Sequence, residues 1–214
     1  MTHYNQIACQ KIDRIEALSD GVFAIALTLL VLEIKVPAAE NAGTETELLH
    51  SLTPLLPKFL SHFLSFMTMG IFYTGQALQL SYIEKYNRDL NWTTLFFLLI
   101  VSLIPFTTAF LGEHISFKLA VGMYWLNILL LGLLLYIHWH CIYTNKFIAF
   151  EGAALKDIDK AIRNRIITAQ CLYLFGALLC FINTYISIGF IILIQLNYAF
   201  AIFSGRIKRK QKHN

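Results

Sequence analysis

Six long runs of apolar residues, separated by short polar connections, make up most of the chain. A helix that crosses a bilayer needs about 20 mostly apolar residues, and each run supplies them. The pattern therefore predicts an all-α polytopic membrane protein with six transmembrane helices. The expected helices cover about 14–36, 56–83, 92–111, 117–143, 163–183 and 185–205, within one domain over residues 1–206.

Individual residues refine this division. Pro105 lies inside the third run and lacks a backbone N–H, so a kink is expected there. The last apolar block, 166–203, is too long for one span. Its polar residues Asn183 and Thr184 favour a tight turn between two helices. The connection 37–54 carries three glutamates and is expected to be a flexible outer loop.

The composition excludes several classes of protein. Hydrophobic residues make up 57% of the 214 positions and charged residues only 14%, with a mean hydropathy of +0.60. Soluble domains are about a quarter charged. A disordered chain, a nucleic-acid-binding domain and an ordinary cytosolic enzyme are therefore excluded. No small-residue cleavage site follows the first apolar run, so we expect this segment to remain in the mature protein.

The distribution of basic residues predicts the orientation in the membrane. With the N-terminus in the cytoplasm, 14 of the 17 Lys and Arg residues fall in cytoplasmic segments. Cytoplasmic loops carry such an excess, so both termini are expected in the cytoplasm of a cell whose inner membrane holds the protein. The basic tail 207–214 could be read as a nucleic-acid patch. An anchor at an anionic leaflet is the favoured interpretation, and no nucleic-acid partner is expected.

Asp20 distinguishes the first helix from the other five. An unpaired carboxylate inside an apolar span costs about 2.5–3.5 kcal/mol on insertion scales. Asp20 must therefore find partners in the helix bundle or in water. Two interpretations stay open, a functional site and a structural polar cluster that fixes helix packing.

Helical phase assigns a face to Asp20. At 100° per residue, one side of the first helix carries a continuous stripe. Asp20 lies about 140° from the centre of this stripe, and Ser19 lies about 120° away in the other direction. If the stripe lines a conduit, Asp20 does not face it and instead braces the helix, together with Ser19 and an arginine. The stripe consists of Leu18, Gly21, Ile25, Thr28, Leu29 and Leu32.

The segment Arg14-x-x-x-Leu18-Ser19-Asp20 resembles the Arg-x-x-x-Phe-Ser-Asp signature of the transmembrane protein 175 family of potassium channels. The resemblance is dense from Arg14 to about Val36, a tenth of the chain. Leu18 departs from the phenylalanine that is usual in the family, which affects the local packing but not the charges.

This resemblance implies a bacterial single-repeat homotetramer whose central pore is lined by the first helix. The apolar constriction falls on Ile25, further apolar layers fall on Leu29 and Leu32, and Thr28 adds a hydroxyl. The group Arg14, Ser19 and Asp20 is then the polar network that holds the pore helices together. The family lacks a Thr-Val-Gly-Tyr-Gly filter, and this sequence has none.

The expected function is a potassium-permeable cation channel that closes by dewetting of a narrow apolar neck. The alternative is a secondary cation or proton-coupled transporter that uses Asp20, and a third hypothesis is a small membrane enzyme or scaffold. The expected partners are identical subunits, the lipid bilayer and monovalent cations. No cofactor is expected apart from permeant potassium ions.

Metal and enzyme chemistry find little support in the sequence. His138 and His140 lie two residues apart on a predicted helix, so their side chains point about 200° apart and cannot easily share one metal ion. No Ser-His-Asp arrangement or glycine-rich phosphate loop appears. The sequence therefore predicts neither a metal site nor an enzyme.

Overall fold

The computed structural model describes residues 10–36, 44–83, 85–148 and 153–210, with side chains for 11–36, 44–83, 85–148 and 155–199. The described chain is all-α apart from one short strand pair, β1 (Gln10–Lys11) with β2 (Lys85–Tyr86). Two short 3-10 helices, η1 (Thr53–Leu55) and η2 (Leu179–Phe181), continue neighbouring helices. The α-helices are α2 (Asp13–Leu32), α3 (Glu45–Leu52), α4 (Leu56–Leu80), α5 (Arg88–Ser102), α6 (Ile104–Glu113), α7 (Lys118–Thr144), α8 (Ala153–Leu178) and α9 (Thr184–Lys210).

Within the described residues, five helical stretches are long and apolar enough to cross a membrane. A sixth, Thr184–Ala199, is apolar but shorter. The five longer stretches are Asp13–Leu32, Glu45–Leu80, Arg88–Glu113, Lys118–Thr144 and Leu155–Phe181. The protein is therefore a multi-pass membrane protein.

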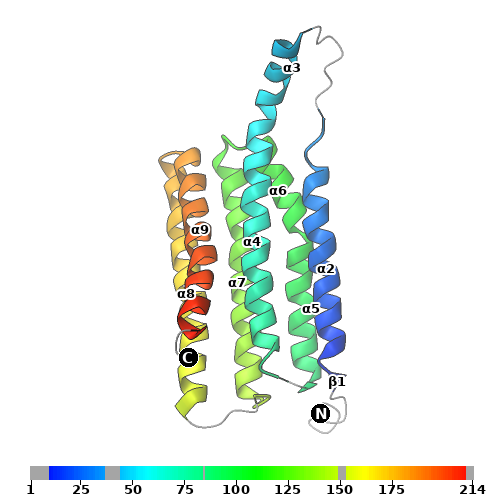
Figure 1. Cartoon of the computed structure of the whole chain (residues 1–214), viewed down its shortest axis with the longest axis vertical. Helices are drawn as coiled ribbons and strands as arrows, with labels where there is room; N and C mark the ends of the chain where they lie inside the picture. The colour runs from blue at the N-terminus through cyan, green and yellow to red at the C-terminus, as the bar shows by residue number, and fades with distance from the viewer. Residues whose placement is uncertain (1–9, 37–43, 84, 149–152, 211–214) are drawn as a thin grey trace.

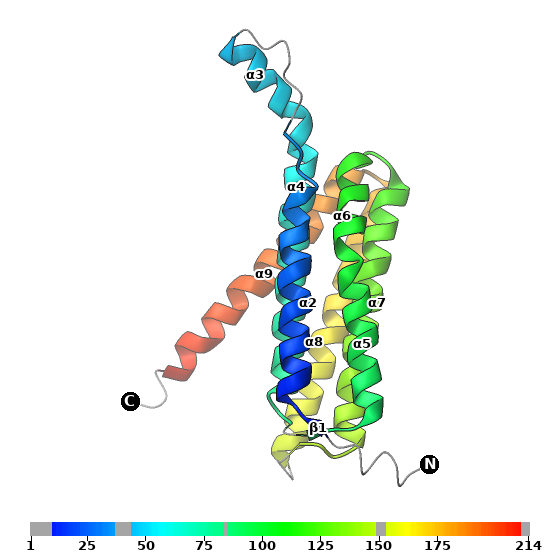
Figure 2. The same cartoon turned by 90° about the vertical axis from the view of Figure 1, so that its right-hand side faces the viewer.

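The helices stand side by side and alternate in direction (Figure 1). α2, α4, α5, α6 and α7 form one group, while α8 and α9 pack together against α7 and α4 on one side. α3 rises above the bundle as a continuation of α4 (Figure 2). The C-terminal part of α9 leans away from the bundle in the same view.

The third span divides into two helices just before a proline. α5 ends at Ser102 and α6 begins at Ile104, with Pro105 in its first turn. The N–H of Leu103 bonds to the carbonyl of Ile100 at 3.2 Å, which tightens the chain at this point. Because Pro105 has no N–H to donate to the preceding turn, the helix cannot continue regularly through it.

The first helix is shorter than the sequence suggests. α2 ends at Leu32, whereas the expected helix extends to Val36. The N–H of Ile34 bonds back to the carbonyl of Val31 at 3.0 Å, which closes the helix with a tight turn. A proline follows Val36, and the residue before a proline avoids the helical conformation.

The second half of the expected outer loop is helical. The Thr44 hydroxyl accepts a hydrogen bond from the Glu47 N–H at 3.3 Å, and the Glu47 carboxylate accepts one from the Thr44 N–H at 3.2 Å. This capping box starts α3, which runs through η1 into α4. Glu40 lies outside the described residues.

The fifth helix also extends beyond its apolar span at its N-terminal end. α8 begins at Ala153, whereas the expected helix begins at 163. Its first turns are charged, and Asp159 pairs with Arg163 one turn later at 2.6 Å. The basic tail 207–214 lies in α9 as far as Lys210, and 211–214 lie outside the described residues.

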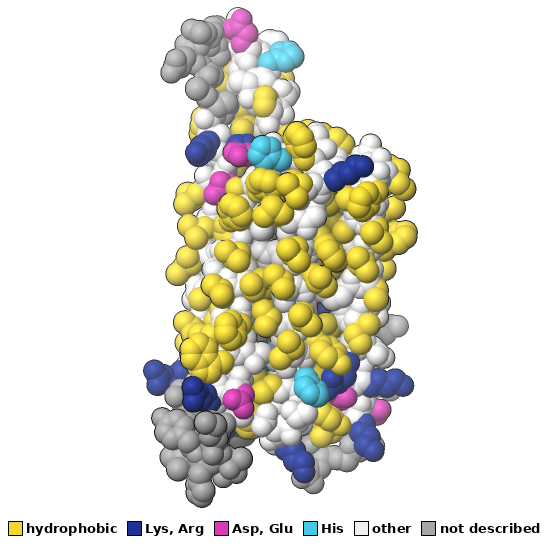
Figure 3. Space-filling model, turned by 180° about the vertical axis from the view of Figure 1, so that it is seen from behind, with side chains coloured by type: hydrophobic (Ala, Val, Ile, Leu, Met, Phe, Trp, Pro, Cys, Tyr) yellow, Lys and Arg dark blue, Asp and Glu magenta, His cyan; other side chains and the backbone are white. Residues whose placement is uncertain are grey.

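On the face shown in Figure 3, hydrophobic side chains cover the middle of the bundle, as a bilayer-embedded protein requires. Lysine and arginine side chains gather mainly at the end of the bundle where the chain begins. At this end β1 pairs antiparallel with β2, and a small buried cluster surrounds Ile15, Trp139 and Ile142. The start of α2 is therefore fixed to the rest of the subunit.

Candidate pore helix

α2 presents two different faces. One face packs into the bundle and consists of Ile15, Ser19, Phe23, Ala26 and Leu30. The opposite face stays exposed in the subunit, with Ile25 62%, Leu29 42% and Leu32 66% exposed. All six residues of the predicted stripe, Leu18, Gly21, Ile25, Thr28, Leu29 and Leu32, belong to this exposed face.

Phe23 anchors the buried face. Its ring meets the ring of Tyr73 edge-on at 5.3 Å between centroids and lies 6.1 Å from the ring of Phe97. Phe72 joins the same group through Phe97 at 6.4 Å. α2 is thus held by α4 on one side and α5 on the other, which fixes the direction of its exposed face.

Thr28 is the one residue of the exposed stripe with a polar side chain. Its hydroxyl donates a hydrogen bond of 2.8 Å to the backbone carbonyl of Ile25. The hydroxyl proton is therefore used within the helix, and the lone pairs of the hydroxyl oxygen remain free to contact a positively charged or hydrogen-bond-donating group. A cation, or the water around a cation, is such a group.

Two polar side chains of α2 bind α4. Ser19 is 3% exposed and accepts a hydrogen bond of 3.3 Å from the Gln76 amide. The Asp20 carboxylate accepts a hydrogen bond of 3.1 Å from the Tyr73 hydroxyl. Glu16 lies beside them, and these side chains line a hollow of about 180 Å³ between the two helices.

Arg14 stays apart from this cluster. It is exposed, and neither Arg14 nor Asp20 takes part in an ion pair within the described part of the subunit. The two residues are six positions apart, so they point about 120° apart around α2 and lie about 9 Å apart along its axis. The structure therefore joins Ser19 and Asp20 to α4 but does not bring Arg14 to them within one subunit.

The histidines weighed as metal ligands have other contacts. The Nδ1 of His138 lies 2.7 Å from the side-chain oxygen of Gln79, while His140 lies 3.4 Å from the Arg163 guanidinium. Across the described residues, no three His, Cys, Asp or Glu side chains gather as metal ligands.

Comparison with known proteins places this geometry in a family. The sequence model described as endosomal/lysosomal potassium channel TMEM175 matches residues 14–105. A protein of Chryseobacterium sp. (strain P1-3), named a potassium channel, is 30% identical over 203 residues, which cover 94% of this chain and 98% of that protein. The chain belongs to the TMEM175 family. The resemblance based on Arg14, Ser19 and Asp20 is thereby confirmed.

Further TMEM175 proteins extend the comparison. The crystal structure of a lysosomal potassium-selective channel TMEM175 homolog from Chamaesiphon minutus matches with a TM-score of 0.75 and 30% identity, covering 89% of this chain and 97% of that chain. The chicken (Gallus gallus) endosomal/lysosomal proton channel TMEM175 is 33% identical over 98 residues, 44% of this chain and 20% of that protein. These TMEM175 relatives are ion channels, and the chain is not an enzyme, as its sequence predicts.

The TMEM175 motif has partners that the sequence analysis missed. Tyr73 and Gln76 hold Asp20 and Ser19, and neither was singled out beforehand. A usable signal was present, because the two residues are three positions apart in an apolar span and so share one face of α4. A polar pair on one face of a spanning helix indicates a polar partner on a neighbouring helix.

Proposed function

We propose that four copies of this chain form a potassium-permeable cation channel in the cell inner membrane, with α2 of each copy lining a central pore. The observation that carries the proposal is the exposed stripe of α2, which lies opposite the face that Phe23 anchors in the bundle. Fourfold rotation would bring four such stripes to one axis. Apolar residues also suit a lipid-facing surface, and membership of a channel family favours the pore.

The proposed pore has side-chain walls. The backbone carbonyls of a helix already accept hydrogen bonds within it, so they cannot replace the hydration shell of an ion. From Ile25 to Leu32 the helix rises about 10 Å at 1.5 Å per residue. Rings of Ile25, Leu29 and Leu32 would form an apolar neck of that length. Such a neck closes by dewetting and conducts when the helices tilt or rotate apart.

Potassium is the proposed permeant ion because its dehydration costs less than that of sodium. The neck offers no charged side chain, so little compensates the free energy that an ion loses when it sheds part of its hydration water. Four Thr28 oxygens would supply lone pairs at one level of the neck and offset part of this cost. Thr28 is therefore the proposed pore-lining selectivity residue.

The polar residues near the start of α2 are proposed to hold the pore helices in place. Ser19 and Asp20 fix α2 to α4 within one subunit. Arg14 is exposed and is proposed to complete the network between subunits. The excess of basic residues at the N-terminal end of the bundle supports an orientation with both termini in the cytoplasm.

The test is potassium flux into liposomes that contain the purified protein. The variant Ile25→Asn should hydrate the neck and raise the basal flux above that of the parent protein. Val31→Asn is the matched control, since Val31 is a 53% exposed residue of the same helix but lies about 120° from Ile25. Equal flux through both variants and the parent would show that Ile25 does not line the constriction.

A secondary transporter is the second candidate, and the hollow beside Asp20 favours it. The hollow places two carboxylates, Asp20 and Glu16, next to a tyrosine hydroxyl between α2 and α4. A transporter should saturate with substrate and should lose coupling in Asp20→Asn. A channel should show unitary currents, and Asp20→Ala should harm assembly or opening more than ion preference.

A further inference from the structure

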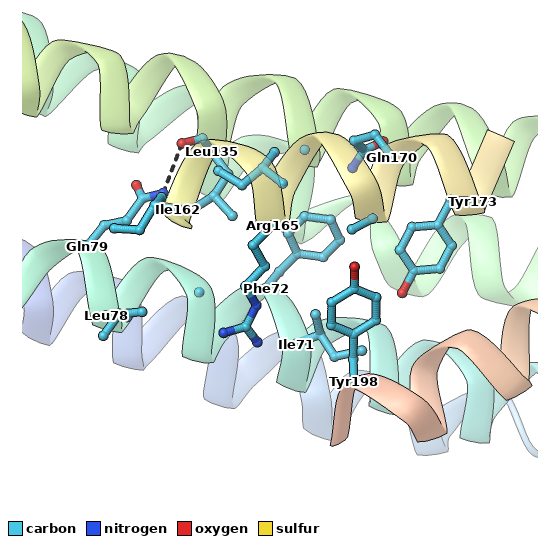
Figure 4. A pocket seen from close by; sticks show the side chains of 14 residues that line it. Ile71, Phe72, Leu78, Gln79, Leu135, Ile162, Arg165, Gln170, Tyr173 and Tyr198 are labelled. Atoms are coloured by element: carbon cyan, nitrogen blue, oxygen red, sulfur yellow. Dashed lines mark hydrogen bonds between the residues drawn. The ribbon is translucent and has the colours of Figure 1, made fainter. Parts of the chain in front are cut away.

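A narrow groove lies between α4, α7, α8 and α9, away from α2 (Figure 4). Its enclosed volume is small, about 60 Å³, and the groove is open along one side. Most of its wall is apolar and comes from residues such as Phe72, Leu78, Leu135, Ile162 and Ile166. An apolar chain fits this lining better than water does.

One unpaired cation lines the groove. The Arg165 guanidinium lies over the ring of Tyr198, 5.9 Å from its centroid, and forms no ion pair within the described residues. Arg163, two residues earlier on α8, differs in this respect because Asp159 neutralises it. Arg165 is exposed and has no ion pair among the described residues, so its guanidinium is free to bind an anionic group from outside the subunit.

Two buried polar atoms in the groove also lack partners. Tyr173 is 1% exposed, and its hydroxyl makes no hydrogen bond with a described residue. The side-chain oxygen of Gln170 is likewise buried without a hydrogen bond, while its amide nitrogen donates to the Ile128 carbonyl at 3.4 Å. Buried polar groups of native proteins are usually satisfied. An acyl chain would satisfy neither atom, so both need water or a side chain such as Gln195, which lies beside the Tyr173 hydroxyl.

The groove has its basic residue near one end of the bundle and its apolar wall running towards the middle, as a lipid has its headgroup at the membrane surface and its chains inside. Leu78 and Gln79 line one end of the groove, close to the end of α4 at Leu80, which the proposed orientation puts at the cytoplasmic side. In Figure 4 the Arg165 side chain lies between Leu78 and Tyr198, and Tyr173 lies toward the opposite end. The C-terminal part of α9 leans away from the bundle (Figure 2), so we expect the open side of the groove to face the bilayer.

We propose that the groove binds an anionic phospholipid of the cytoplasmic leaflet, with the phosphate at Arg165 and one acyl chain along the apolar wall toward Tyr173. Basic sites between spanning helices on the cytoplasmic side recognise anionic headgroups. A soluble anion would use Arg165 but leave the apolar wall empty, and a zwitterionic lipid would bring no net charge to Arg165. This inference requires insertion in a membrane but not the pore, so it can fail or hold independently of the proposed channel.

Native mass spectrometry of the detergent-solubilised protein tests the headgroup. Phosphatidylglycerol and phosphatidylcholine with identical chains are added in equal amounts, and the lipid retained on the protein is counted. The parent should retain phosphatidylglycerol several-fold more, and Arg165→Gln should lose this preference. Lys160→Gln is the matched control, since Lys160 is an exposed cation of the same helix outside the groove. No preference in the parent, or equal losses in both variants, overturns the proposal.

Two further arms test the acyl chain. Ala169→Leu fills part of the groove while leaving Arg165 in place, so it should reduce retention of both lipids. Millimolar inorganic phosphate should not displace the lipid, because it cannot occupy the apolar wall. Unchanged retention in Ala169→Leu, with the variant eluting like the parent in size-exclusion chromatography, overturns the acyl-chain assignment. Displacement by phosphate would assign Arg165 to a soluble anion instead.

Discussion

The Tyr73 hydroxyl donates a hydrogen bond to the Asp20 carboxylate at 3.1 Å, and the ring of the same tyrosine packs against Phe23 at 5.3 Å. One residue of α4 therefore holds α2 through a polar contact and an aromatic contact at once. The two contacts fix α2 both along its axis and around it. The direction of the exposed stripe thus depends on Tyr73.

Tyr73→Phe removes the polar contact and keeps the aromatic one. The variant should lose about 0.5–1.5 kcal/mol of stability, the usual net contribution of one hydrogen bond. Thermal unfolding in detergent, followed by tryptophan fluorescence, measures the loss. Tyr82→Phe is the control, since the Tyr82 ring packs on Trp139 and does not contact Asp20. Equal melting temperatures for Tyr73→Phe and the parent would show that the Asp20 contact contributes nothing.

Thr28 offers a test of ion selectivity. Thr28→Val has nearly the same shape but no oxygen, so potassium should lose its advantage over sodium if the hydroxyl replaces hydration water. Thr28→Ser keeps the oxygen and should keep the preference. Reversal potentials of the reconstituted protein under opposing potassium and sodium gradients measure the effect. A preference that is unchanged in Thr28→Val would exclude the hydroxyl from selection.

A buried polar cluster inside the bundle gives a third prediction. The Thr68 oxygen accepts a hydrogen bond of 2.6 Å from Gln195 and lies 2.9 Å from the Tyr124 hydroxyl, joining α4, α7 and α9. Thr68→Val leaves the Gln195 amide without its acceptor and should cost about 1–3 kcal/mol. Thr74→Val should stay within about 0.5 kcal/mol, because Thr74 is exposed and, among the described residues, its hydroxyl bonds to carbonyls of its own helix. The shift of the unfolding midpoint in a denaturing detergent compares the two, and a similar shift for both would contradict the prediction.

The sequence predicts the spans and the faces of α2 because both follow from one-dimensional patterns. A bilayer requires about 20 apolar residues per helix. When one face of a helix packs against its neighbours, the angle of each residue around the helix axis tells which residues are buried and which are exposed. Asp20 illustrates the rule, since its phase excluded it from the stripe that contains Ile25. The structure places Asp20 against α4 and leaves Ile25 exposed on the opposite side.

The features that sequence analysis missed depend on contacts or on signals other than hydropathy. Tyr73 is 53 positions from Asp20, and no pattern along the chain states which helices become neighbours. α3 and the start of α8 are too polar to register as spans. Each had a local signal, the capping box of Thr44 and Glu47 and the one-turn spacing of Asp159 and Arg163.

Two glycines of α7 provide the last prediction as a matched pair. A Cβ at Gly132 would overlap the Gln170 side chain, whereas a Cβ at Gly122 would meet nothing within 4 Å. Gly132→Ala should therefore displace Gln170 from the Ile128 carbonyl and separate α8 from α7, lowering stability by about 1–3 kcal/mol. Gly122→Ala adds the same methyl group in open space and should be neutral or more stable by up to about 1 kcal/mol, since alanine favours the helix. Thermal unfolding of both variants in the same detergent isolates the packing cost, because the change in helix propensity is common to the two. Equal melting temperatures would show that α8 accommodates the methyl group without losing its contact with α7.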